Sequence, residues 1–372
     1  MKRSILPLLL LFALAGCSHN SPAPTVSKAA PPTPSLPPLA RLPTVSPTVT
    51  SFPKPPGALA YWKAGSDYVQ NLAFSPNGKR LATVDGGDTV QEWDAHSGKC
   101  LHSLQIAGSY IGTVAYSPDG LWLAATGAKD NTKENLYLWS EHSGKLIHTL
   151  TMSDASMSGI EFTTNHQLIL EGDASVDLWD TKTWQRRRHF LTPTGSDRIS
   201  VFASGGKRLV TDKQTGQTQI RSVFTGKILA KWREHHFDGI GYQSSVFSPD
   251  GRWLAAVVSS NRTDNPNIEI READTGRLVR TLKRTQCGIT FSLSGNTLAA
   301  YAWDYGVPHD GFTLWNIETG AHEAVDAAGE LCAAFSPDGR RLATGDTEGN
   351  IIIVRVPSDM RVNSRRGRGG KH

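Results

Sequence analysis

The chain has 372 residues, which allows two or three ordinary domains or one large all-β domain. Ten of its 39 basic residues lie in residues 1–57 and 361–372, which hold no acid, so residues 58–360 contain 29 basic and all 34 acidic residues. The pI of about 9.0 therefore describes the ends, and the mildly acidic middle excludes a basic nucleic-acid-binding domain. Four Met and four Cys exclude a Met-rich groove and a disulfide-dense scaffold.

The N-terminus has the pattern of a targeting segment. A basic start, Met1-Lys2-Arg3, precedes the apolar run 5–14, which is too short to span a bilayer as a helix. The run ends in Leu14-Ala15-Gly16-Cys17, which resembles the cleavage box of bacterial lipoproteins. The resemblance implies cleavage before Cys17, acylation of that residue and, with Ser18 following, an outer-membrane location facing the periplasm. The alternative is an ordinary secretory signal with a chance cysteine.

A proline-rich linker follows the lipidated cysteine. Residues 21–57 contain 12 of the 21 prolines, and proline blocks helices and central strands. Such a segment favours polyproline II at about 3.1 Å per residue, so it reaches on the order of 100 Å when extended. We therefore expect a spacer that holds the rest of the chain away from the membrane.

An aromatic residue followed by a Ser-Pro-Asp-Gly-like turn recurs seven times. The seven aromatics are spaced by 42, 46, 40, 45, 44 and 44 residues, and they are Phe74, Tyr116, Phe162, Phe202, Phe247, Phe291 and Phe335. Each unit continues with an apolar strand, then an alternating strand and a Ser/Thr-Gly-Lys-like turn into a fourth strand. A steady period with four short strands per unit predicts the blades of a propeller.

The third strand of each unit ends in a recurring pair of residues. The pairs are Trp93-Asp94, Trp139-Ser140, Trp179-Asp180, Arg221-Ser222, Arg271-Glu272, Trp315-Asn316 and Arg355-Val356. With the turns and the period, they resemble the Trp-Asp (WD) repeat β-propeller family. No Gly-His dipeptide precedes a first strand, so that family's Asp-His-Ser/Thr-Trp tetrad is incomplete here.

The resemblance predicts an all-β, seven-bladed β-propeller over residues 58–357. The last unit has only three strands, and the spare strand 58–62 sits where an outer strand belongs, so it should complete the seventh blade and close the ring. The predicted organisation is a signal peptide (1–16), a lipidated Cys17 with a Pro-rich linker (17–57), the propeller (58–357) and a basic disordered tail (358–372).

Longer connections gather on one face of the predicted ring, called the top face here. It carries the connections from second to third and from fourth to first strands; the bottom face carries the others. Aromatic, charged and amide side chains in three long loops of neighbouring blades suit recognition of a peptide or a glycan, and solvated loop padding is the alternative. The candidate binding residues are His235, His236, Tyr242, Asn261, Arg262, Asp264, Trp303, Asp304, Tyr305 and His309.

No pattern for catalysis or metal binding stands out. The two neighbouring histidines His235 and His236 match no standard zinc spacing, and no nucleophile elbow or phosphate-binding loop occurs, so we expect no metal, no cofactor and no enzyme. Cys287 and Cys332 fall on neighbouring inner strands with opposite facing, which favours buried thiols over a disulfide.

The expected function is a membrane-anchored envelope lipoprotein whose propeller acts as a scaffold for another envelope protein or peptide. An envelope polysaccharide or peptidoglycan binder that stacks sugars on Trp303 and Tyr305 is the alternative, and a hydrolase or lyase is less favoured. We expect a monomer that binds no nucleic acid. The basic tail has an anionic surface as its candidate partner, or no partner at all.

Overall fold

A computed structural model gives the fold of the chain. It describes a part of the chain in fifteen stretches, which are residues 55–65, 68–129, 133–152, 157–163, 166–172, 175–191, 197–202, 207–213, 217–223, 225–233, 245–258, 267–283, 288–301, 311–325 and 330–361. The predicted signal peptide, Cys17 and all but the last three residues of the predicted linker lie outside these residues, as do Cys287 and the end of the basic tail.

Short strands make up the regular structure of the described residues, where no helix occurs. They are β1 (Ala58–Lys63), β2 (Asn71–Phe74), β3 (Arg80–Val84), β4 (Thr89–Asp94), β5 (Cys100–Gln105), β6 (Ser109–Tyr116), β7 (Trp122–Lys129), β8 (Lys133–Ser140), β9 (Leu146–Thr151), β10 (Met157–Thr163), β11 (Gln167–Gly172), β12 (Ser175–Asp180), β13 (Gln185–Leu191), β14 (Asp197–Phe202), β15 (Arg208–Lys213), β16 (Gln217–Ser222), β17 (Ile228–Arg233), β18 (Ser245–Phe247), β19 (Trp253–Val258), β20 (Asn267–Glu272), β21 (Leu278–Leu282), β22 (Gly288–Phe291), β23 (Thr297–Tyr301), β24 (Phe312–Asn316), β25 (His322–Val325), β26 (Glu330–Phe335), β27 (Arg341–Asp346) and β28 (Asn350–Arg355).

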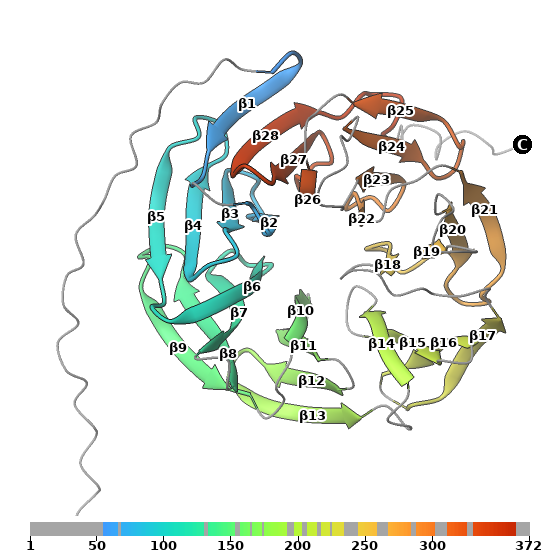
Figure 1. The fold of residues 1–372 in the computed structure, drawn as a ribbon. Coiled ribbons are helices and arrows are strands. Elements are labelled where there is room, and N and C mark those ends of the chain that lie inside the picture. The colour runs from blue at the N-terminus through green and yellow to red at the C-terminus, as the bar shows by residue number, and fades with distance from the viewer. Residues whose placement is uncertain are drawn as a thin grey trace, which may run out of the picture. The chain divides into compact units, whose positions relative to one another are not determined.

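The strands form seven four-stranded antiparallel sheets arranged as a ring (Figure 1). Blades 1 to 6 each take four consecutive strands, from β2–β5 to β22–β25, and every blade contacts its two neighbours. Blade 7 has the order β1-β28-β27-β26, with Ala58 paired to Val354 and Lys63 to Asn350. The predicted seven-bladed fold and its closure by an N-terminal outer strand are therefore confirmed.

The Ser-Pro-Asp-Gly turn is held by its own side chains. In blade 7 the Ser336 hydroxyl donates to Asp338 Oδ1 over 2.6 Å, and that oxygen also accepts the amide of Arg340 over 3.0 Å. Gly339 follows with a φ of 66°, a value that glycine adopts without steric cost. Blades 1, 2 and 5 repeat this geometry, which explains why the motif marks each unit so clearly.

A leucine of the second strand and a large residue of the third strand pair in each blade. In blade 1 Leu81 pairs with Trp93, and the buried Trp93 Nε1 donates to Thr83 Oγ1 over 2.9 Å. Blades 3 and 6 keep the tryptophan but have Leu170 and Ala300 where blade 1 has the threonine. In the described residues the indole nitrogens of these two tryptophans have no partner, which fits the predicted incomplete tetrad.

Blade 7 keeps the threonine of this hydrogen bond but lacks the tryptophan, and its strand register corrects the alignment predicted from the sequence. Leu342 pairs with Val354, so the Trp-Asp position is Val354-Arg355 rather than the predicted Arg355-Val356. The alignment by sequence was off by one because nothing in the apolar run Ile351–Val354 marks the register. Thr344 lies where Thr83 lies in blade 1. Because blade 7 has no tryptophan, no indole N–H donates to the buried Thr344 hydroxyl, which has no hydrogen-bond partner among the described residues.

The folded body extends beyond the predicted boundary at residue 357. Met360 is 2% exposed and belongs to the cluster of buried residues between blades 6 and 7. Its carbonyl oxygen accepts the Thr297 hydroxyl over 2.6 Å, and Asn316 Nδ2 donates to the Asp359 carbonyl over 3.3 Å. Residues 358–361, predicted as part of a disordered tail, are thus held on the bottom face, because Met360, an apolar residue among polar ones, is buried there.

Candidate interaction faces

The ten candidate binding residues predicted from the sequence all lie outside the described residues. The strands that flank their loops are described. Residues 259–266 connect β19 to β20, residues 302–311 connect β23 to β24, and residues 234–244 connect β17 to β18. These are second-to-third or fourth-to-first connections, as predicted. The assignment of a binding face to these loops stays a prediction.

A described part of the top face, at blades 1 and 2, presents an aromatic residue that sequence reasoning missed. Tyr110, the second residue of β6, is 45% exposed, and its hydroxyl accepts a 2.5 Å hydrogen bond from Gln70 Nε2 just before β2. Exposed tyrosines beside amide groups are typical of surfaces that recognise peptides. Its signal in the sequence is a tyrosine at the start of a first strand, before the alternating residues of the core.

Close backbone packing fixes the top face between blades 7 and 1. A Cβ on Gly345 would lie 2.6 Å from Val69, so only glycine fits there. The Val69 amide donates to the Asp346 carbonyl over 2.9 Å, and the buried Cys332 thiol donates to the Val69 carbonyl over 3.2 Å. Cys332 is thus buried as predicted. These contacts of Val69 with blade 7, called the Val69 seam here, hold blades 7 and 1 together at the top face.

Outer strands hold neighbouring blades together at their third-to-fourth turns. A ring or guanidinium of one blade lies on the turn glycine of the next, where a Cβ would collide with it. The contacts are Trp62 on Gly98, His102 on Gly144, Trp232 on Gly276 and Arg280 on Gly320. Absence of a side chain at these glycines lets the blades approach closely.

Blade 3 has a tryptophan instead of a glycine at this contact between blades. Trp184 occupies the place of the turn glycine and has a φ of 52°, a left-handed value that is strained for a bulky residue. Its ring lies edge-on to Trp122 with centroids 5.9 Å apart, and 5.6 Å from the ring of His148. Both partners belong to blade 2, so the contacts of the Trp184 ring with the neighbouring blade offset the strain of its backbone.

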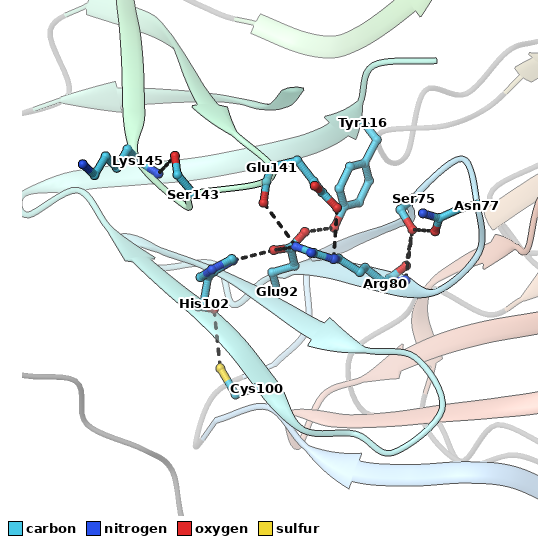
Figure 2. A network of polar contacts seen from close by, with 10 residues as sticks. All are labelled: Ser75, Asn77, Arg80, Glu92, Cys100, His102, Tyr116, Glu141, Ser143 and Lys145. Atoms are coloured by element: carbon cyan, nitrogen blue, oxygen red, sulfur yellow. Dashed lines mark hydrogen bonds and ion pairs between the residues drawn. The ribbon is translucent and has the colours of Figure 1, made fainter. Parts of the chain in front are cut away.

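A buried polar network links blades 1 and 2 (Figure 2). Glu92 lies at its centre with its side chain 2% exposed, directly before Trp93 in β4. Its carboxylate lies 2.7 Å from His102 Nδ1 and accepts Arg80 Nη1 over 2.9 Å, both within blade 1. From blade 2, Tyr116 donates its hydroxyl over 2.7 Å, and Glu141 pairs with Arg80 Nε over 3.0 Å.

This network changes the pKa values of its members. Burial by itself raises the pKa of Glu92, but hydrogen bonds from His102 and Tyr116 and the Arg80 charge together bring it below its ordinary value. Burial, and then the charge of Glu92, raise the pKa of Tyr116 well above its ordinary value. Glu92 is therefore an ionised, fully partnered carboxylate that joins two blades, and all its partners are side chains of this chain.

The described residues provide neither a metal cluster nor a spanning helix. No group of three or more His, Cys, Asp or Glu side chains comes together in this part of the chain. A search of the same residues for a helix both long and apolar enough to cross a membrane finds none.

Comparison with known proteins assigns the repeat. The family profile "WD domain, G-beta repeat" (WD40) matches residues 59–94, 98–132 and 320–354. The chain carries WD40 repeats. Each match contains an outer strand of one blade and inner strands of the next, so a WD40 repeat spans two blades of the ring. The three matches cover the arc of blades 6, 7, 1 and 2.

Three relatives of similar sequence come from eukaryotes. The chain is 23% identical over 296 residues to a Periodic tryptophan protein 2 homolog of Caenorhabditis elegans, a match that covers 76% of this chain and 30% of that protein. It is 22% identical over 318 residues to a Guanine nucleotide-binding protein subunit beta of Oryza sativa subsp. japonica, covering 77% and 80%. A THO complex subunit 3 of Arabidopsis thaliana is 36% identical over 69 residues, or 18% of this chain and 22% of that protein. None of these relatives supports the bacterial lipoprotein signal predicted from residues 1–17.

Proposed function

We propose that this WD40 propeller is a lipid-anchored scaffold that holds another protein of the cell envelope on its top face. WD40 propellers typically act as protein-interaction scaffolds, and the names of two relatives, a G-protein subunit and a THO complex subunit, place those proteins in assemblies. The observation that carries the proposal is the exposed Tyr110 with its Gln70 partner on a face held rigid by the Val69 seam.

The membrane anchor in this proposal rests on the sequence of the first 17 residues. Cys17 would carry the lipid, and the proline-rich segment to residue 57 would let the propeller search a large volume around the anchor. Labelled palmitate tests this step in bacterial cells that make the chain. Label on the wild type but not on Cys17→Ser supports the anchor; label on neither removes it.

Site-specific photo-cross-linking tests the partner and its face. A photoreactive residue is placed at Tyr110 on the top face and, as the matched control, at Leu121 on the bottom face, which is 60% exposed. The proposal expects one discrete protein adduct from position 110 and none from position 121. It also expects Tyr110→Ala or Trp303→Ala/Tyr305→Ala to reduce co-purification of that protein.

Two results would contradict the scaffold. Adducts of equal yield at both positions would show that the top face is not selective. Retention on peptidoglycan or polysaccharide fractions that is lost in Trp303→Ala/Tyr305→Ala, without any protein adduct, would replace the scaffold by a glycan-binding propeller.

A further inference from the structure

Blade 7 carries arginines on its bottom face that form no ion pair with a carboxylate of the described residues. Arg341 and Arg355 pair across β27 and β28, and the carbonyl of Arg340 accepts the amide of Val356, so these arginines share one edge with Arg361 close by. Arginines on other blades, such as Arg80 and Arg208, form ion pairs with acids. Among the described residues, none of the four blade 7 arginines does.

The acids nearest to these arginines serve other purposes. Against the effect of burial, the pKa of Asp338 is lowered first by the Ser336 hydroxyl and the Arg340 amide, which its Oδ1 accepts, and then by the charges of Arg341 and Arg340, although it forms no ion pair with either arginine. Asp359 is exposed beside the packed Met360. Lys79 of blade 1 extends the edge, since Arg341 donates to the carbonyl of the neighbouring Gly78 over 2.6 Å. Cationic side chains thus outnumber carboxylates around the bottom turns of blade 7, and Asp94 of blade 1 and Glu318 of blade 6 are the acids of the adjoining third-to-fourth turns.

Apolar side chains stand on both sides of these cationic turns. Leu293 in blade 6 and Leu121 in blade 2 are 59% and 60% exposed, the highest values among the large apolar side chains of the described residues. Both belong to bottom-face turns. Leu293 takes the place of the turn proline, and Leu121 takes the place that Lys79 has in blade 1.

A cavity of about 350 Å³ lies next to Leu293. It opens between the bottom turns of blades 6 and 7 and is lined by the serines Ser292 and Ser294, by Asp338 and by Arg361. An exposed leucine beside cationic side chains combines the two contributions to interfacial binding, burial of apolar area and attraction to anionic lipids.

Both chain ends join the propeller at this same face. Residues 55–57 lead into β1 at Ala58, which pairs with Val354 at the bottom end of β28. At the other end the sequence continues from Arg361 into a segment with Arg365, Arg366, Arg368 and Lys371. The described residues from which the predicted linker and the basic segment continue, 55–57 and 358–361, therefore both lie at the bottom face.

We propose that the bottom face of blades 6, 7 and 1 docks on an anionic lipid bilayer. Arg340, Arg355 and Arg361 face lipid phosphates, and Leu293 enters the headgroup layer. Docking extends the proposed membrane tether by fixing the orientation of the propeller, so that its top face points away from the membrane toward a partner. It does not need the acyl chain, and it is tested without it.

Vesicle flotation of the full chain with Cys17→Ser tests the docking. Neutral phosphatidylcholine vesicles are compared with vesicles rich in phosphatidylglycerol. We expect binding to the anionic vesicles only, weakened by added salt. Arg340→Gln/Arg355→Gln/Arg361→Gln should weaken it on the order of a hundredfold, at about fivefold per arginine. Leu293→Ser should weaken it by about tenfold.

The matched control removes the same charge elsewhere. Lys63→Gln/Lys231→Gln/Lys283→Gln changes three exposed lysines on or beside the outer strands and should leave binding unchanged. Urea unfolding of each variant confirms that it is folded. Equal losses in the control and the arginine variant, or equal binding to neutral vesicles, would overturn the proposal.

A soluble polyanion separates a bilayer from any other anionic partner. If heparin binds as tightly as the vesicles and Leu293→Ser changes neither, the face is a polyanion site and the bilayer proposal is wrong. Palmitate labelling of Cys17 is independent of all these measurements. Failure of labelling with intact vesicle binding removes the anchor alone, and the reverse result removes the docking alone.

Discussion

The hydroxyl of Tyr116 in blade 2 donates a 2.7 Å hydrogen bond to the buried Glu92 carboxylate of blade 1. Removing this donor with Tyr116→Phe should lower the free energy of unfolding by about 1.5–3 kcal/mol, because the acceptor is charged. Tyr137→Phe is the control, since Tyr137 is also buried but its hydroxyl makes its 3.2 Å hydrogen bond with the neutral Ser109 hydroxyl of its own blade. It should lose about 0.5–1.5 kcal/mol in the same urea titration. Equal losses would show that Glu92 does not join the blades.

Glu92 should also give the fold a dependence on pH. Its hydrogen bonds and the Arg80 charge hold the pKa of Glu92 below the ordinary value of 4.5 in the folded state. The ionised group therefore stabilises the fold above that pH, and this stability is lost as the pH falls through the folded-state pKa. The difference in unfolding free energy between wild type and Glu92→Gln should be full at pH 7 and shrink below pH 4.5. A constant difference across this range would contradict the assignment.

Replacing a buried threonine by valine should destabilise the protein in blade 1 but not in blade 7. Thr83→Val leaves the buried Trp93 Nε1 without an acceptor and should cost about 1–3 kcal/mol. Thr344→Val replaces a buried hydroxyl that has no partner among the described residues and should be neutral or stabilising. Urea unfolding of the two variants side by side checks this, and a loss at Thr344 as large as that at Thr83 would refute it.

Because the backbone at Trp184 is left-handed, we expect the glycine variant at this position to be more stable than the alanine variant, which reverses the usual order. Both Trp184→Gly and Trp184→Ala lose the contacts with Trp122 and His148, but only glycine relaxes the strain at a φ of 52°. The glycine variant should be more stable by about 1 kcal/mol. At the neighbouring strand residue Gln185 the ordinary order, alanine above glycine, should hold. Thermal unfolding of the four variants measures both differences.

The repeated part of the fold could be predicted from the sequence because its signals are local. The turn at Ser336 repeats the chemistry of the turn at Ser75, and the period of its aromatics fixes the number of blades. Even closure by β1 followed from a fixed spacing, since Trp62 lies as far before Phe74 as Leu104 lies before Tyr116.

The features that escaped prediction are those where the repeat fails. Trp184 takes the place of a turn glycine although Asp180 and Thr183 before it follow the pattern of the other turns, and Met360 lies in a segment that looks like a polar tail. The Glu92 network depends on a strand of the next blade, so neither blade's sequence shows it alone. The Tyr110 face and the arginines of blade 7 become visible only when strands distant in sequence are placed side by side.

Closure of the ring by β1 makes completeness of the chain a condition for folding. Tyr61 bonds Asn350, which lies 289 positions later, so the first strand to be synthesised waits for the last one. Bringing them together costs about 5 kcal/mol of chain entropy, and the backbone pairing of β1 with β28 cannot form until the final blade exists. A chain that stops early would leave an unpaired edge on its first strand as well as on its last. Proteases of the cell would then remove truncated products that still contain six intact repeats.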